Sequence, residues 1–92
     1  MQRVKIKLIL NDGLQMRRNN INNLMVVNAE QGIARLYYDI RLQLVNVLPE
    51  DAIFIMINGL LPAMNKKIIE LYDAHSKEGI LSISVFKENA FG

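Results

Sequence analysis

The residue types that carry most enzyme chemistry are sparse in this chain of 92 residues. It has no cysteine and a single histidine, His75, which excludes thiolate nucleophiles, disulfides and zinc sites built from several such ligands. Ser76, Ser82 and Ser84 lack the surrounding motif of a catalytic serine. We therefore expect no catalytic residue, no metal site and no cofactor, and a protein that is not an enzyme.

Positive charges gather early in the chain, at Arg3, Lys5, Lys7, Arg17 and Arg18. Such a group suits anionic lipid or an acidic peptide flank, although a plainly solvated face is the simpler interpretation. The net charge is only +2 and 51% of residues are hydrophobic, which predicts a globular domain with no nucleic-acid partner. No apolar stretch is long enough for a membrane span or a signal peptide, so we expect a cytosolic or nuclear protein. We also expect it to be a monomer.

Four segments read as β-strands. Residues 3–10 and 80–86 alternate apolar and polar side chains, which is typical of strands with one wet face. Residues 24–27 suit a short strand that ends at Asn28. Residues 53–57 are continuously apolar and precede an Asn-Gly turn, which predicts a strand covered on both faces, or nearly so.

Two segments read as helices. Residues 33–44 carry apolar side chains at helical spacing, with Asn28 or Glu30 available to the helix N-terminus. Residues 64–74 predict a shorter helix that Gly79 ends.

On the outer surface of the longer helix, Arg35 and Asp39 are four residues apart and form a weak ion pair. Tyr38 and Leu42, with the same spacing, form an exposed apolar pair.

The order of elements predicts an α+β domain. The amphipathic helix must lie across one face of the sheet, and the first and last strands suit its centre. This is a β-grasp (ubiquitin-like) arrangement: a four-stranded mixed sheet with one long helix across it and one short helix. We expect a single domain over residues 1–92, in which residues 87–92 form a flexible C-terminal tail.

Several segments, taken in order, resemble the autophagy ubiquitin-like modifiers of the GABARAP and light-chain-three family. The resemblance is carried by Arg3-Val4 and by four longer segments: YYDIR at 37–41, DAIFIMINGLLP at 51–62, IELYDAH at 69–75 and ENAFG at 88–92. Together they span nearly the whole chain.

The resemblance implies chemistry at Gly92, preceded by Phe91. Activating and conjugating enzymes of ubiquitin-like proteins would activate the carboxyl group of Gly92 and transfer it to phosphatidylethanolamine on autophagosomal membranes. Glycine suits this step because, without a Cβ, its carbonyl is open to attack. The implied location is the cytoplasm, and the autophagosomal membrane when the chain is lipidated.

The family also binds adaptor peptides with an aromatic-x-x-aliphatic motif by β-augmentation of an edge strand. By position, the resemblance implies one pocket lined by Met25, Val27 and Leu36, with Ile40 beneath it. Val26 and Ile80 match the other pocket.

The chain also departs from the family. Lys5 and Lys7 replace apolar residues, Asp39 replaces an aliphatic residue, and Gln43 stands where an arginine is common. The family's two N-terminal helices do not precede the first strand, either by removal from a longer chain or because the protein never had them. Lys5 and Lys7 favour the second explanation, since burying unpaired lysines under helices is costly.

Three alternatives therefore stay open. One is the lipid-linked modifier. Another is the related modifier that is joined to a lysine of an autophagy scaffold protein. The third is a β-grasp interaction module that is never conjugated. The sequence leaves open which adaptors bind and whether a longer precursor is processed at Gly92.

Overall fold

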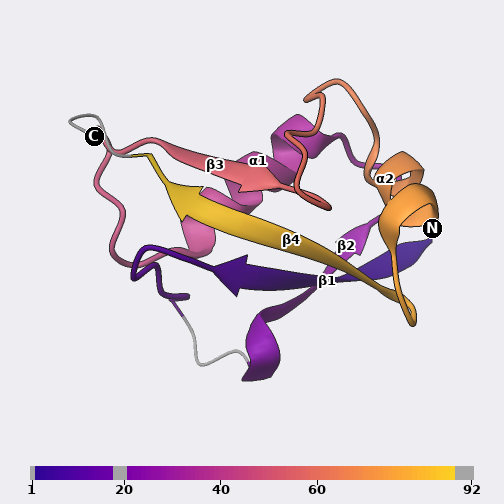
Figure 1. Ribbon diagram of the computed structural model, residues 1–92, viewed down its shortest axis with the longest axis horizontal. Helices are drawn as coiled ribbons and strands as arrows, with labels where there is room; N and C mark the ends of the chain where they lie inside the picture. Colours follow the sequence, from indigo (N-terminus) through magenta and orange to yellow (C-terminus); the bar gives the residue numbers. More distant parts are fainter. Residues whose placement is uncertain (1, 18–20, 89–92) are drawn as a thin grey trace.

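The computed structural model describes residues 2–17 and 21–88, and its elements alternate between strands and helices (Figure 1). In chain order they are β1 (Arg3–Leu10), the 3-10 turn η1 (Ile21–Asn23), β2 (Leu24–Asn28), α1 (Ile33–Gln43), β3 (Ile53–Met56), α2 (Ile68–His75) and β4 (Ile80–Lys87). The predicted order of strands and helices is confirmed.

The four strands form one mixed sheet in the order β2-β1-β4-β3. β1 and β4 pair in parallel at the centre, whereas β2 and β3 are antiparallel edge strands. The first and last strands of the chain thus occupy the middle of the sheet, as their matching apolar sides predicted (Figure 1). This parallel pair needs the long crossover through α1, β3 and α2.

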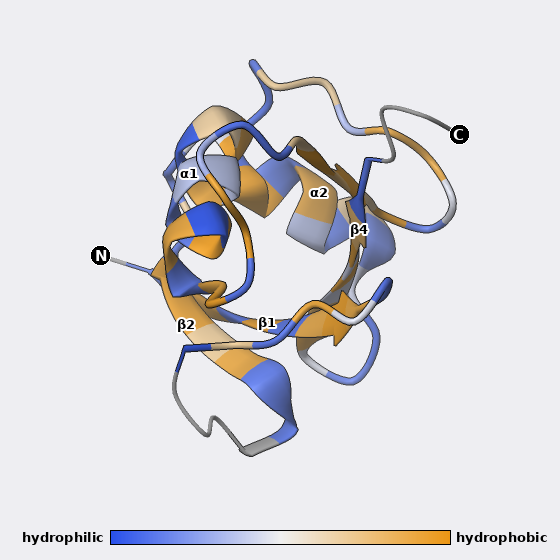
Figure 2. Ribbon diagram, turned by 90° about the vertical axis from the view of Figure 1, so that its left-hand side faces the viewer, coloured by the Kyte–Doolittle hydropathy of each residue, from blue (hydrophilic) through white to orange (hydrophobic). Residues whose placement is uncertain are grey.

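The core lies between the sheet and the two helices, which sit on its concave side (Figure 2). Alternate residues of β1 and β4 and one stripe of α1 supply it, as period two and period 3.6 require. The fully buried side chains are Ile6, Leu8, Ile33, Leu36, Ile40, Ile55, Ile68, Leu81, Ile83 and Val85. Each contributes on the order of 1.5–3 kcal/mol by leaving water.

The starts of the two helices are held by each other's flanking backbone. The N–H of Ile33 donates to the carbonyl of Lys66 at 2.8 Å, and the N–H of Ile68 donates to the carbonyl of Gln31 at 2.8 Å. These bonds satisfy amides that a helix leaves without an internal partner.

The expectation that Asn28 or Glu30 serves the N-terminus of α1 is wrong. The N-cap residue is Gly32, which makes no side-chain bond to the helix. Asn28 Oδ1 instead accepts from the N–H of Glu30, and Glu30 pairs with Lys67 at 3.3 Å.

Gly79 does not end α2, which stops earlier, at His75. The cap is Ser76, whose N–H donates to the carbonyl of Tyr72 at 2.9 Å. Glu78 and Gly79 have φ of 53° and 78°, and they form the turn into β4 that the Lys77–Ile80 backbone bonds close. The glycine marks a tight turn because it tolerates positive φ.

β3 is fully covered on one face and partly covered on the other, which is less than its continuous apolar sequence predicts. Ile53 and Ile55 are buried, whereas Phe54 and Met56 are half-buried on the other face. Phe54 stacks on Phe86 of β4, with ring centroids 5.0 Å apart and planes 13° from parallel. The stacked rings shield each other on a sheet face that the described helices leave open.

Candidate functional site

Val26 is the residue of β2 at which an additional strand can reach the outer edge of the sheet, since the carbonyl of Asn28 already accepts from the N–H of Gln31 at 3.1 Å. Arg3 faces Asn28, Val4 faces Val27 and Lys5 faces Val26 in the β1–β2 ladder. The next pair along the ladder is Gln2 with Ala29, and the N–H of Ala29 donates to the carbonyl of Gln2 at 3.0 Å. Because hydrogen-bonded and non-hydrogen-bonded pairs alternate in an antiparallel ladder, Lys5 and Val26 form a non-hydrogen-bonded pair. The N–H and C=O of Val26 therefore point away from β1, toward the outer edge of the sheet.

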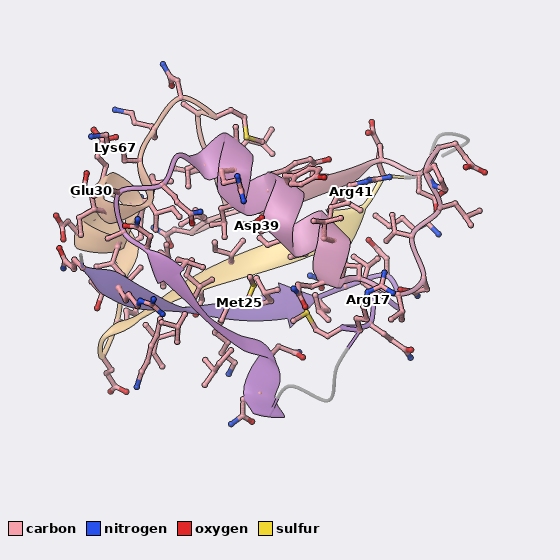
Figure 3. The ribbon with its side chains drawn as sticks, turned by 180° about the vertical axis from the view of Figure 1, so that it is seen from behind. Arg17, Met25, Glu30, Asp39, Arg41 and Lys67 are labelled. Atoms are coloured by element: carbon pink, nitrogen blue, oxygen red, sulfur yellow. The ribbon has the colours of Figure 1, made fainter. Side chains whose placement is uncertain are left out.

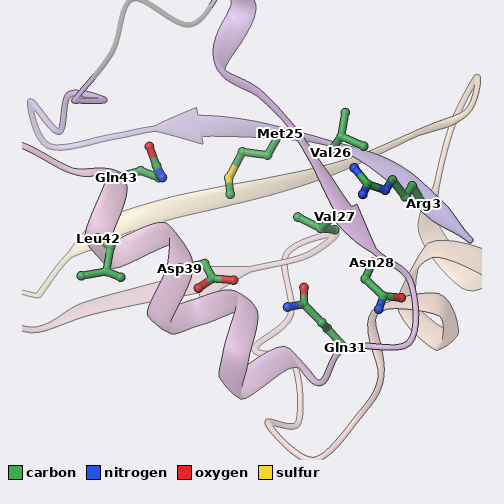
Figure 4. A pocket seen from close by; sticks show the side chains of 9 residues that line it. All are labelled: Arg3, Met25, Val26, Val27, Asn28, Gln31, Asp39, Leu42 and Gln43. Carbon is green, nitrogen blue, oxygen red and sulfur yellow. The ribbon is translucent and has the colours of Figure 1, made fainter. Parts of the chain in front are cut away.

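A groove of about 330 Å³ runs between this edge and α1 (Figure 4). Its described lining residues are Arg3, Met25, Val26, Val27, Asn28, Gln31, Asp39, Leu42 and Gln43. β2 supplies the apolar wall, and α1 supplies the opposite wall with one carboxylate and one amide. Figure 3 shows Met25 and Asp39 on the side of the molecule where α1 crosses the sheet.

The groove is amphipathic. Met25 is half-buried, while Leu42 and Val26 are 52% and 57% exposed. Asp39 and Arg3 are the charged side chains among the lining residues that the structure describes. Such a surface offers both apolar contact and one charged group on each side of β2.

Asp39 is held in place by its neighbour on the helix. Its Oδ1 accepts a hydrogen bond from Nε of Arg35 at 3.2 Å, which confirms the predicted pair. The Asp39 side chain is 26% exposed and that of Arg35 is 65% exposed, so the pair lies at the surface. An exposed pair at this spacing is worth a few tenths of a kcal/mol.

The groove contains half of the residues expected to bind peptide. Met25, Val26 and Val27 line it. Leu36 and Ile40 are completely inaccessible to solvent and belong to the core below.

Ile80 lies elsewhere. It is on β4, paired with Lys5 of β1, and β1 separates β4 from β2. The two pockets implied by the resemblance therefore fall on different faces of the sheet, since Val26 also faces Lys5.

Gln31, Asn28 and Leu42 also line the groove, and sequence reasoning did not assign them to it. Leu42 carried a signal, because its spacing from Tyr38 marks an outward-facing apolar pair. Asn28 and Gln31 carried none, since only the fold of the β2–α1 connection places them there.

The sheet face opposite the helices is half basic and half apolar. Lys5, Lys7 and Ser82 are exposed there, which agrees with the polar face expected from their alternation. Phe54 and Phe86 occupy the other half. Exposed lysines at the centre of a sheet are unsuited to burial beneath further helices.

The end of β4 is tied down through Glu88. The N–H of Lys87 donates to Asp12 Oδ2 at 3.0 Å, its Nζ lies 3.3 Å from Asp51 Oδ2, and the N–H of Glu88 donates to the carbonyl of Ala52 at 2.8 Å. Residues 87 and 88 of the expected tail are thus held on the sheet. The conjugation residues Phe91 and Gly92 lie outside the described residues.

The structure alters the titration of the Asp51 carboxylate. The N–H of Leu48 donates to Asp51 Oδ2 at 2.9 Å. This bond, with Lys87 and Arg41 nearby, holds the pKa of Asp51 below its ordinary value of 3.8 against a smaller opposing effect of desolvation.

Within residues 2–17 and 21–88, neither helix is long and apolar enough to cross a bilayer. The same residues contain no group of three or more His, Cys, Asp or Glu side chains able to hold a metal ion.

The fold is that of a ubiquitin-like β-grasp protein. No protein-family model and no curated protein matches the sequence. Among solved structures, the crystal structure of Trypanosoma brucei ATG8 aligns with 98% of this chain and 77% of its own, with a TM-score of 0.77 and 18% identity. At this identity the likeness shows the fold alone, and it confirms the α+β class and the β-grasp arrangement predicted from the sequence.

Proposed function

We propose that this chain is a ubiquitin-like modifier of the autophagy type, joined to an amine through the carboxyl group of Gly92. The observation that carries the proposal is the ATG8-like fold over 98% of the chain, combined with the resemblance of residues 88–92 to the family's aromatic-glycine ending. The central strand β4 leads directly to this ending and is hydrogen-bonded up to Glu88. The proposed conjugation residue thus follows a segment that is held on the sheet as far as Glu88.

The chemistry belongs to partner enzymes, and this chain supplies the acyl group. An activating enzyme joins the carboxylate of Gly92 to the AMP portion of ATP and releases pyrophosphate. An enzyme thiol then displaces AMP to form a thioester. The acceptor amine attacks the carbonyl, forms an amide and frees the thiol. The chain needs no catalytic residue or cofactor of its own for these steps.

The first acceptor we propose is phosphatidylethanolamine of autophagosomal membranes, as the resemblance to the GABARAP and light-chain-three family implies. The protein would then be cytoplasmic before lipidation and membrane-associated after it. The peptide groove beside β2 would bind adaptors in either state, since the free edge and the end of β4 are separated by β1.

A second acceptor, a lysine of a scaffold protein, is favoured by one observation. Lys5 and Lys7 are exposed on the central strand, on the face that the lipid-linked family covers with helices. A modifier whose ubiquitin-like core lacks those helices would leave these lysines in water, where their charge costs nothing.

Thioester formation tests the proposal. The chain is incubated with ATP and the activating enzyme of an autophagy modifier, and the product is separated with and without reductant. We expect an adduct that reductant removes and that neither Gly92→Ala nor deletion of Gly92 forms. Unchanged charging of the chain lacking Gly92 would contradict the proposal and leave a non-conjugated interaction module.

The mass of the cellular form separates the two acceptors. A phospholipid adds less than about one kilodalton, whereas a protein acceptor adds many times more. Digestion of the adduct identifies the amine in either case.

A further inference from the structure

The groove beside β2 carries the carboxylate of Asp39 at a position where the family has an aliphatic residue. Asp39 lies on α1, one turn from Leu42, and lines the groove opposite Met25 and Val27 (Figure 4). We propose that this groove receives a lysine or arginine side chain from a peptide that pairs with the edge of β2, and that Asp39 selects it. The inference rests on the peptide docking proposed above and names the chemistry of the partner.

The ladder geometry determines which side chains of the peptide reach Asp39. In an added strand, successive side chains point to opposite faces of the sheet. Those on the helix side meet Met25, Val27 and Asp39, which lie on the inner side of β2. Those on the outer side meet Val26 and Arg3. The carboxylate and the guanidinium therefore act on different side chains of the docked segment.

A basic side chain matches the inner part of the groove better than an aliphatic one. Its methylene stem can lie against Met25 and Leu42 while its charged head reaches the carboxylate. The contact is a charge-assisted hydrogen bond, which is stronger than one between neutral groups. A leucine at the same position would desolvate the carboxylate of Asp39 without donating a hydrogen bond to it.

The existing partner of Asp39 leaves room for this contact. Arg35 binds Oδ1, and in the part of the chain that the structure describes Oδ2 has no protein donor. Arg35 is the more exposed member of the pair and approaches along the helix, one turn before Asp39. Oδ2 is therefore available to accept from a second cation.

The test compares two synthetic peptides that differ in one residue. Both carry an aromatic residue and two intervening residues, followed by either lysine or leucine. Binding to the full chain is followed through the amide signals of Met25, Val26 and Val27 in solution NMR. The proteins are the wild type, Asp39→Asn, Asp39→Leu, and Asp73→Asn as a matched control on the exposed surface of α2.

We expect the lysine peptide to bind the wild type and Asp73→Asn about tenfold more tightly than the leucine peptide. Asp39→Asn should remove this preference, and Asp39→Leu should reverse it. Added salt should weaken only the lysine peptide.

Equal or tighter binding of the leucine peptide by the wild type would overturn the role of Asp39 while leaving docking at β2 intact. Absence of shifts at the three amides with both peptides would overturn this inference and the docking together. Neither result affects the thioester at Gly92, which is measured separately.

Discussion

The hydroxyl of Tyr37 donates a hydrogen bond of 2.8 Å to the carbonyl oxygen of Ile53. This bond joins the middle of α1 to the first residue of β3, at the sheet edge opposite β2. The ring packs against the core while the hydroxyl satisfies a backbone acceptor, as buried tyrosines commonly do. It thereby ties α1, which also forms one wall of the groove, to the far side of the sheet.

Removing this hydroxyl should destabilise the fold. We expect Tyr37→Phe to lower the free energy of unfolding by about 1 kcal/mol, because the carbonyl of Ile53 loses its donor in a half-buried site. Urea denaturation measures the change. Tyr38→Phe, on the exposed surface of the same helix, serves as control and should stay within about 0.5 kcal/mol of the wild type. Equal losses in both variants would contradict a specific role for the Tyr37–Ile53 bond.

The contacts of Asp51 predict a pH dependence of stability. Because its pKa is lowered in the folded state by the Leu48 N–H and by Lys87, the charged carboxylate stabilises the fold above its unfolded pKa, near 3.8. This contribution is lost as pH falls through the lower, folded pKa.

We therefore expect Asp51→Asn to be less stable than the wild type at about pH 7, and the difference to shrink toward about pH 3. Urea titrations at both pH values measure it, with Asp73→Asn as a surface control. A gap that stays constant between the two pH values would show that ionisation of Asp51 does not stabilise the fold.

The peptide-site residues should separate into two classes on substitution. We expect Ile40→Ala to cost about 2–5 kcal/mol, because it leaves a cavity in a site with no solvent access. Val26→Ala should change stability by less than about 0.5 kcal/mol, yet weaken peptide binding at the edge. Thermal denaturation and peptide titration on the same samples measure both. A large stability loss in Val26→Ala would place its side chain in the core instead.

We expect the turn after β3 to need glycine at position 59 because of the backbone conformation there, and not because a side chain would clash. Gly59 has φ of 76°, and an added Cβ would meet no atom within 4 Å. We expect Gly59→Ala to cost about 1–2 kcal/mol from the left-handed conformation. Asn58→Gly is the matched control, because φ of 53° also suits glycine there. If Gly59→Ala were as stable as the wild type in urea denaturation, the turn would tolerate another conformation.

The sequence predicted those features that local periodicity carries. The alternation in β1 and β4 and the stripe along α1 predicted one buried side for each element, and Ile6, Ile83 and Ile33 on these sides are fully buried. Matching apolar faces also predicted the central pair of strands. The spacing of apolar residues determines which side of a strand or helix is apolar, and the apolar sides of different elements pack against one another in the core.

Predictions from the local sequence pattern were wrong where a segment distant in the sequence supplies the contact. Helix α1 begins on carbonyls from the segment before α2, so no side chain near Ile33 marks its start. Continuous apolar sequence in β3 indicated two covered faces, whereas an aromatic pair with Phe86 covers one of them in part. Neither partner lies within reach of a local window.

The residues of the candidate site also fall into those that the sequence predicted and those that only the tertiary structure placed. Met25, Val26 and Val27 were predicted from the edge-strand resemblance, and all three line the groove. The crossing of α1 over the sheet decided that Leu36 and Ile40 lie below the groove and that Asp39 enters it. The order of the strands decided that Ile80 lies across β1. A sequence states which residues one element can present together, but only the packing of two elements decides which of them share a groove.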